Sequence, residues 1–284
     1  IINNSIFNEN SIDNSESQGA AVYVDAGAAL NANNVNFTDN TATYRGGAIY
    51  SEGTVNVDTA VFDGNDITFR TKNDDNGGAA IYNLNGVLNV NKANITNNLK
   101  NIVIRNGNAG DLLVGVVVSS GETTITDSYF ANNTGSWGGA ISSLGYLNSN
   151  PYTLTVTGTT FEGNNATFGG AIFVESSNLV VDDCTFTENT ATDEGGAIYY
   201  SNAVNCNFTD NTASDQGGAI YIANDCHNAQ MTNCNFADNS ASSGTAIYCD
   251  GSGDGKVTDC NFGVTPDLSV ETGYPIMTLT LGSD

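Results

Sequence analysis

Short apolar segments recur along the chain with the spacing of strands. Counted back from a recurring phenylalanine, apolar residues often occupy the positions seven and five residues earlier, as Val55 and Val57 do before Phe62. This step of two residues places both side chains on one face of a strand. The residue two positions before the phenylalanine is small or of modest size, and the odd step to it requires a bend if all these side chains are to face inward. The pattern therefore predicts short strands separated by corners.

Two motifs repeat throughout the sequence. The first, Phe-x-x-Asn, recurs every 22 to 35 residues, and the second, Gly-Gly-Ala-Ile followed by an aromatic residue, alternates with it. Copies of the first begin at Phe7, Phe37, Phe62, Ile95 (a variant), Phe130, Phe161, Phe186, Phe208, Phe236 and Phe262 (without the Asn). Intervals of about 20 to 50 residues are typical of solenoids, propellers and repeat arrays.

Each repeat supplies about three short strands, which is one coil of a parallel β-helix, whereas a propeller blade needs about four antiparallel strands. We therefore predict an all-β fold, a right-handed parallel β-helix (β-solenoid) of about ten coils over residues 1–265. Residues 266–284 lack the repeat and are expected to form a C-terminal strand, a cap or a linker to a following domain. Stacked coils should align phenylalanine on phenylalanine and join the motif asparagines into an amide ladder.

The chain is strongly acidic. Its 284 residues include 31 Asp and Glu against 7 Lys and Arg, which gives a formal net charge of −24. Nucleic-acid binding and docking on anionic lipid both need clustered basic residues, so neither partner is expected. No apolar run approaches the roughly 18 residues of a membrane helix, so we expect no membrane insertion by this segment. The sequence begins inside a repeat without a signal peptide, and we interpret it as part of a longer protein.

The paired motifs resemble those of known families. Repeats that combine Gly-Gly-Ala-Ile with Phe-x-x-Asn mark the chlamydial polymorphic membrane proteins, and the Asn- and Thr-rich stretch at residues 206–221 is similar to methanogen adhesin-like proteins. The resemblance covers residues 7–262 and departs from the pattern at residues 98–127 and at Ser142. It implies an extracellular β-helix displayed on the cell surface, with a glycan or protein of another cell as partner. Lateral self-association of such rods is also left open.

Aromatic residues form the first candidate binding surface. Because the Ile of the glycine motif should face inward, the aromatic residue after it should face outward. This predicts an external column made of Tyr23, Tyr50, Tyr82, Phe173, Tyr199, Tyr221 and Tyr248. Trp137 and Phe168 each precede a glycine pair and should lie side by side on a rim, with Tyr44 and Arg45 on the same edge. Exposed aromatic surfaces often bind sugars or proteins; the alternative is that these rings only protect a sheet face.

The positions of the cysteines predict buried packing for most of them, and no metal site. Four of them, Cys184, Cys206, Cys234 and Cys260, stand two residues before successive copies of the motif phenylalanine, so they should stack as a buried column. Cys226 and Cys249 lie outside that column and could form a disulfide. No Cys and His spacing suits a metal site, so no metal or other cofactor is expected. Asp250 and Asp254 form only the first half of a calcium loop, which makes them a weak calcium candidate.

Two further features suit a surface protein. Asn-x-Ser/Thr sequons, the acceptors of N-glycosylation, occur at Asn3, Asn36, Asn94, Asn132, Asn165 and Asn207. Five of the seven basic residues lie around the irregular segment and could bind an acidic glycan there, the alternative being solvated loop charges. They are Arg70, Lys72, Lys92, Lys100 and Arg105.

Catalysis is the second alternative to adhesion. Polysaccharide lyases and glycoside hydrolases of the pectinase type also use parallel β-helices, and their sites group acids with His or basic residues. Here His227 is far in sequence from Arg70 and Lys72, and no repeat combines the required groups. We therefore expect no catalytic residues and a non-enzymatic binding module. The first alternative to it is a structural surface spacer with no binding site of its own.

Overall fold

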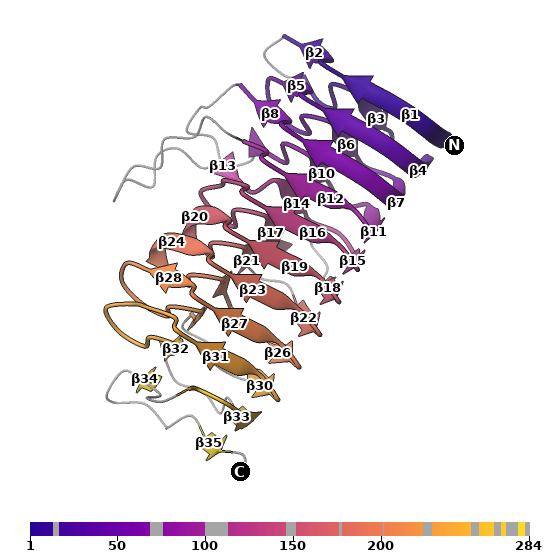
Figure 1. Ribbon diagram of the computed structural model, residues 1–284. Helices are drawn as coiled ribbons and strands as arrows, with labels where there is room; N and C mark the ends of the chain where they lie inside the picture. The colour runs from indigo at the N-terminus through magenta and orange to yellow at the C-terminus, as the bar shows by residue number, and fades with distance from the viewer. Residues whose placement is uncertain are drawn as a thin grey trace.

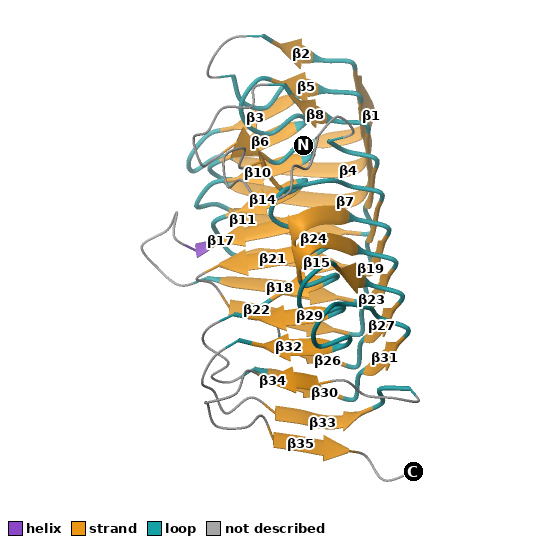
Figure 2. Cartoon of the chain, turned by 90° about the vertical axis from the view of Figure 1, so that its left-hand side faces the viewer, coloured by secondary structure: helices purple, strands orange, loops and turns teal. Residues whose placement is uncertain are grey.

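The strands of successive coils pair in parallel, each lying beside its counterpart one repeat away (Figure 1). In this computed structural model, the described residues are 1–13, 17–68, 76–99, 113–145, 152–175, 178–200, 202–223, 229–250, 256–263, 268–270 and 278–281. Seen from the side, the coils lie one above another along a single axis (Figure 2). The predicted parallel β-helix is confirmed.

Two long sheets run the length of the stack. The 17-stranded sheet contains β1 (Ile2–Asn8), β4 (Ala29–Thr38), β7 (Thr54–Asp63), β11 (Val87–Asn91), β12 (Asn94–Thr96), β15 (Thr123–Thr126), β16 (Tyr129–Ala131), β18 (Thr153–Thr157), β19 (Thr160–Glu162), β22 (Asn178–Asp182), β23 (Thr185–Thr187), β26 (Ala203–Val204), β27 (Asn207–Thr209), β30 (Gln230–Thr232), β31 (Asn235–Ala237), β33 (Lys256–Cys260) and β35 (Thr278–Leu281). The 10-stranded sheet contains β3 (Val22–Val24), β6 (Ile49–Ser51), β10 (Ile81–Asn83), β14 (Val117–Ser119), β17 (Ile141–Leu144), β21 (Ile172–Glu175), β25 (Ile198–Tyr199), β29 (Ile220–Ile222), β32 (Ile247–Cys249) and β34 (Leu268–Val270).

Short sheets complete the coils between the two long ones. They are formed by β2 (Ser11–Ile12), β5 (Thr41–Ala42) and β8 (Asp66–Ile67), by β9 (Asn76–Gly77) and β13 (Leu113–Val114), and by β20 (Asn165–Phe168), β24 (Thr190–Glu194) and β28 (Thr212–Ala213). Near the C-terminus, β34 pairs with β32 and β35 with β33, so both long sheets continue beyond residue 265. The domain boundary at that residue stays a prediction.

Residues in the left-handed region turn the chain at the corners of each coil. One stands three positions before each motif phenylalanine, for example Asp183 with φ 53°. A second stands two positions after it, as Asp210 does with φ 56°. A third is the first glycine of the glycine motif, such as Gly217 with φ 67°. Asn, Asp and Gly tolerate this region best, which explains the composition of the corners. The bend expected before the phenylalanine is confirmed and consists of one left-handed residue.

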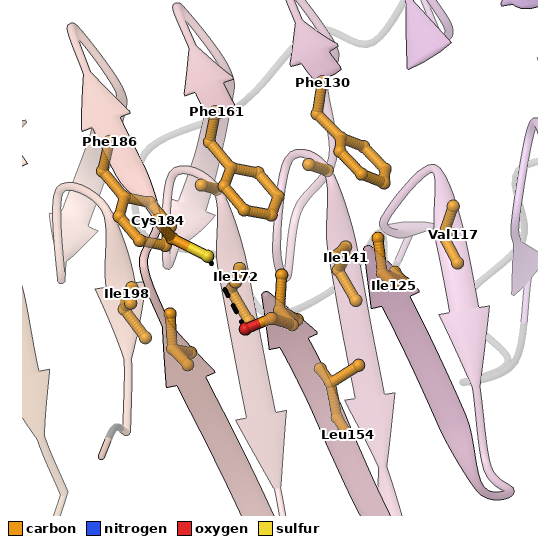
Figure 3. Close-up of a cluster of buried hydrophobic side chains, with 14 of the residues drawn as sticks. Val117, Ile125, Phe130, Ile141, Leu154, Phe161, Ile172, Cys184, Phe186 and Ile198 are labelled. Atoms are coloured by element: carbon orange, nitrogen blue, oxygen red, sulfur yellow. Dashed lines mark hydrogen bonds between the residues drawn. The ribbon is translucent and has the colours of Figure 1, made fainter. Parts of the chain in front are cut away.

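The interior of the stack is apolar. Phenylalanine rings of successive coils stack face to face, with centroids 4.8 Å apart for both Phe161–Phe186 and Phe186–Phe208. Aliphatic residues of the opposite sheet, such as Ile172 and Ile198, face these rings across the core (Figure 3). The predicted stacking of phenylalanine on phenylalanine is therefore confirmed, and stacked rings gain about 0.5–1.5 kcal/mol beyond their buried area.

Four cysteines pack into the same interior. Cys184, Cys206, Cys234 and Cys260 are all buried and free, as expected. The Cys184 thiol points at the Val156 carbonyl oxygen, 3.6 Å away (Figure 3). Neighbouring thiols, and then burial, raise the pKa of Cys206.

Candidate functional site

A column of aromatic side chains follows the outer face of the 10-stranded sheet. Strand pairing aligns Tyr23 with Tyr50 and Tyr50 with Tyr82 near one end, and Phe173, Tyr199, Tyr221 and Tyr248 near the other. Between these two groups the aligned positions are Val118 and Ser142. The sequence predicted this alignment, and the interruption divides the column into an upper and a lower part.

The expected exposure of the column is wrong for most of its members. Tyr50, Tyr82, Phe173, Tyr221 and Tyr248 are buried, and Tyr199 is half-buried. Only Tyr23 is well exposed, at 51%. The rings lie along the sheet and cover one another, with centroids 4.8 to 5.8 Å apart. Tyr50, Tyr82, Phe173 and Tyr199 belong to a second apolar cluster, separate from that of the coil interior, which also contains Val118.

Side chains from the rim, the residues directly before each glycine pair, lean over the column. Trp137 and Phe168 lie side by side on this rim, as predicted. The Trp137 ring stacks on Phe173 at 5.1 Å between centroids, and the Phe168 ring meets Tyr199 edge-on at 5.8 Å. The rim therefore supplies part of the cover that buries the lower column.

In the upper column, the side chain of Arg45 packs on the aromatic rings. The guanidinium carbon of Arg45 lies 4.6 Å from the centre of the Tyr44 ring and 4.9 Å from that of Tyr82. The Tyr50 hydroxyl donates a hydrogen bond to Glu52 Oε1 at 2.8 Å. Burial, followed by this bond, raises the pKa of Tyr50. Tyr44 and Arg45 thus occupy the predicted edge, but they are engaged with each other and with the column.

The lower column borders a pocket of about 370 Å³. Its lining consists of Trp137, Phe168, Phe173, Val174, Glu175, Tyr199, Tyr200 and Ala223. The two rim residues form one wall, and residues that follow the column in the chain form the other. One of these, Tyr200, is held in the left-handed region with φ 68°, where an aromatic residue is rare. Five aromatic side chains and one carboxylate therefore converge on this space.

Acidic residues lie in and around the pocket. Burial raises the pKa of Glu175, the acid in the lining. Burial, and then Asp193, Asp215 and Asp250, raise the pKa of Glu194 to about 7. Burial, with Glu194 and Glu175 as the largest charged neighbours, raises the pKa of Tyr199 to about 12. The site therefore joins ring faces to an excess of negative charge.

A cluster of three of these acids was not foreseen from the sequence. Asp193, Glu194 and Asp215 each place one carboxylate oxygen within 4.8 Å of the others, close enough to share a metal ion. Asp193 and Asp215 stand two residues before the glycine pairs of successive repeats, and the Asp215 N–H donates to the Asp193 carbonyl. This recurrence is the signal that would have revealed the cluster.

Comparison with known proteins supports the architecture. Residues 114–273 match the family described as right handed beta helix region, which is more than half of the chain. The chain belongs to this right-handed β-helix family. No solved structure matches it significantly.

Two further similarities concern the chlamydial proteins. Residues 34–52 of this β-helix match the Chlamydia polymorphic membrane protein repeat. Over 220 residues the chain is 29% identical to the probable outer membrane protein PmpB of Chlamydia muridarum, covering 69% of the chain but only 11% of that relative. These similarities place the β-helix at the cell surface, on the extracellular side. The likeness to methanogen adhesin-like proteins stays a prediction. None of the described segments is a helix with the length and apolarity needed to cross a bilayer.

The remaining predicted sites are scattered over the β-helix. Asn3, Asn36, Asn94, Asn132 and Asn207 of the sequons are exposed, whereas Asn165 is half-buried. Lys92 is exposed at a corner. Outside the described residues lie Arg70, Lys72, Lys100, Arg105, Cys226, His227 and Asp254.

For two of the predicted residue pairs, the structure describes only one of the two residues. Cys249 is disulfide-bonded, but its pairing with Cys226 stays a prediction because Cys226 is not described. Asp250 Oδ2 accepts a hydrogen bond of 2.9 Å from the Tyr221 hydroxyl. The weak calcium candidate is therefore tied to the aromatic column instead of standing free in a turn.

Proposed function

We propose that this β-helix is a non-enzymatic, adhesin-like module that binds a glycan or protein on another cell through the pocket beside Trp137 and Phe168. The observation that carries the proposal is the convergence of five aromatic side chains and Glu175 on one space of about 370 Å³. Aromatic rings dominate the energetics of recognition surfaces, because they combine a large contact area with few rotatable bonds. The similarity to a chlamydial outer membrane protein supports an adhesive role.

The distribution of basic residues supports a binding role over catalysis. A lyase of the pectinase type needs a Lys or Arg as base beside its acids. The sequence holds no Lys or Arg from residue 106 to residue 255, the part of the chain that carries the pocket. The acids there have neighbours that are aromatic or acidic, which favours recognition of a ligand over abstraction of a proton.

The test is binding of the labelled chain to candidate cells and to a glycan array, with the Trp137→Ala, Phe168→Ala double variant beside the wild type. We expect the double variant to bind at least about tenfold more weakly, because it removes one wall of the pocket. Tyr23→Ala and Tyr129→Ala, at exposed aromatics elsewhere, should leave binding unchanged.

Three results would contradict the proposal. Unchanged binding by a folded double variant would exclude the pocket. Absence of any binding by the wild type would favour a spacer. Turnover of a polyuronate would indicate an enzyme.

A further inference from the structure

In the upper part of the aromatic column, an arginine of the chain itself packs on the rings. There the guanidinium of Arg45 lies over the rings of Tyr44 and Tyr82, at 4.6 and 4.9 Å. Glu52 lies close by, since it accepts the hydrogen bond from the Tyr50 hydroxyl and both Glu52 and Arg45 act on the Tyr50 pKa. Ring faces attract cations through their negative quadrupole, and arginine stacks on them well.

The pocket repeats this arrangement lower in the stack. Glu52 stands two residues after Tyr50, and Glu175 stands two residues after Phe173, at the equivalent place on the same sheet. Trp137 and Phe168 occupy the rim positions that correspond to Arg45. Ring faces and a carboxylate are thus present again, with aromatic side chains where the upper coils have the arginine.

The charged residues around the pocket are acidic. Asp193, Glu194 and Asp215 cluster together, and the charges of Glu194, Glu175 and Asp193 act on Tyr199, which lines the pocket. No Lys or Arg occurs from residue 106 to residue 255. Negative charge repels an acidic glycan and attracts a cation. Its long-range field also raises the rate at which a cationic partner meets the pocket.

We infer that the pocket binds an arginine side chain of a partner protein, with the guanidinium on the ring faces and paired with Glu175. The inference rests on the proposed function and names its ligand class. Arginine is enriched at the energetic centres of protein interfaces, where it combines stacking with bidentate pairing to a carboxylate. A neutral sugar could stack on the rings and donate hydroxyl hydrogen bonds to the carboxylates, but it would gain no charge pairing with them.

Trp137 makes the test direct, because it is the only tryptophan in the chain. Its fluorescence is followed while the purified chain is titrated, up to millimolar concentration, with a short peptide carrying one arginine between glycines and serines. Matched probes are the same peptide with citrulline, which has the shape of arginine without its charge, and a neutral oligosaccharide. We expect a saturable change with the arginine peptide and at least tenfold weaker binding of the citrulline peptide.

Substitutions separate charge from packing. Glu175→Gln should weaken binding of the arginine peptide at least tenfold and leave the citrulline peptide unaffected. Glu162→Gln, the same change at an exposed site on the 17-stranded sheet, should have no effect. Equal binding of the arginine and citrulline peptides, stronger binding of the oligosaccharide, or no response to the arginine peptide would each overturn the inference.

The two proposals fail in different ways. If the arginine peptide gives no response while cell binding still depends on Trp137 and Phe168, the ligand class is wrong and the proposed function stands. If cell binding does not depend on these two residues, the proposed function itself is wrong.

Discussion

At the scale of single residues, the asparagine ladder holds one corner of the β-helix together. The Nδ2 group of Asn189 donates to the Phe161 carbonyl and to Asn211 Oδ1, each at 3.0 Å, and its Oδ1 accepts from both nitrogens of Asn164. The side chain is fully buried. Similar bonds link the motif asparagines from Asn10 to Asn239. The predicted amide ladder is confirmed, and it satisfies backbone groups that the sheets leave unpaired at the corner.

Replacement of one rung should therefore be costly. Asn189→Ala removes the acceptor of the buried Asn164 N–H and breaks the side-chain bonds to Asn211 and to the Phe161 carbonyl. These losses should lower the free energy of unfolding by about 3 kcal/mol. The measurement is chemical denaturation followed by circular dichroism. Asn207→Ala, at an exposed position, should change the free energy of unfolding by no more than about 0.5 kcal/mol. Similar stabilities for the two variants would contradict a structural role of the ladder.

Glu194 should make stability depend on pH. Burial and the neighbouring acids raise its pKa from 4.5 to about 7 in the folded protein, so folding favours the protonated form. The resulting stabilisation is fully present below the unfolded pKa and is lost as the pH rises through about 7. Glu194→Gln, which cannot ionise, should therefore raise stability above that pH.

We expect this gain to be on the order of 1 kcal/mol, since solvent screens a half-buried group. Thermal unfolding at acidic and alkaline pH gives the measurement, with Glu162→Gln as the exposed control. Parallel pH profiles for wild type and Glu194→Gln would show that this carboxyl is not perturbed.

At the scale of elements, the second glycine of each pair allows neighbouring coils to approach closely. A Cβ on Gly196 would lie 2.0 Å from the Gly218 carbonyl oxygen and 2.7 Å from the Thr212 backbone. Both neighbours are backbone atoms, which cannot move without separating the coils. The second glycine of the motif is therefore required by packing between coils.

Gly196→Ala should lower the free energy of unfolding by about 3 kcal/mol or more, because it forces the backbone of two coils apart. Gly27→Ala is the matched control: its φ of +77° strains alanine, but no atom stands within 4 Å of the added carbon. This strain alone should cost about 1–2 kcal/mol. An equal loss in the two variants, measured by denaturation, would show that close approach of the coils contributes little.

The fold could be predicted from the sequence because the same residue recurs at the same place in every coil. Alternation along a strand also gives the side of the sheet to which Tyr82 or Tyr221 points. It does not give the exposure of that side chain, which depends on neighbours such as Trp137 and Arg45 that lean over from another part of the coil. The pocket could not be predicted for the same reason, since it lies where the rim changes from Phe168 to Glu194.

At the scale of the molecule, stacking converts a sequence difference into a local surface. Repeats with nearly identical frameworks build a continuous rod, and positions that vary between repeats become neighbours on its outside. In this chain the variation brings aromatic rim residues beside acidic ones, in a stretch that lacks basic residues from 106 to 255. The chain spans about a tenth of the length of its chlamydial relative, and the pocket beside Trp137 and Phe168 is where we propose that it binds a partner.

The most direct test is hydroxyl-radical footprinting of the chain while it is bound to a partner cell. The account predicts reduced oxidation of Trp137, Phe168 and Tyr200, with no change at Tyr23 and Tyr129, which are exposed elsewhere. Protection of Tyr129 on the 17-stranded sheet, with Trp137 and Phe168 oxidised as in the free chain, would contradict it.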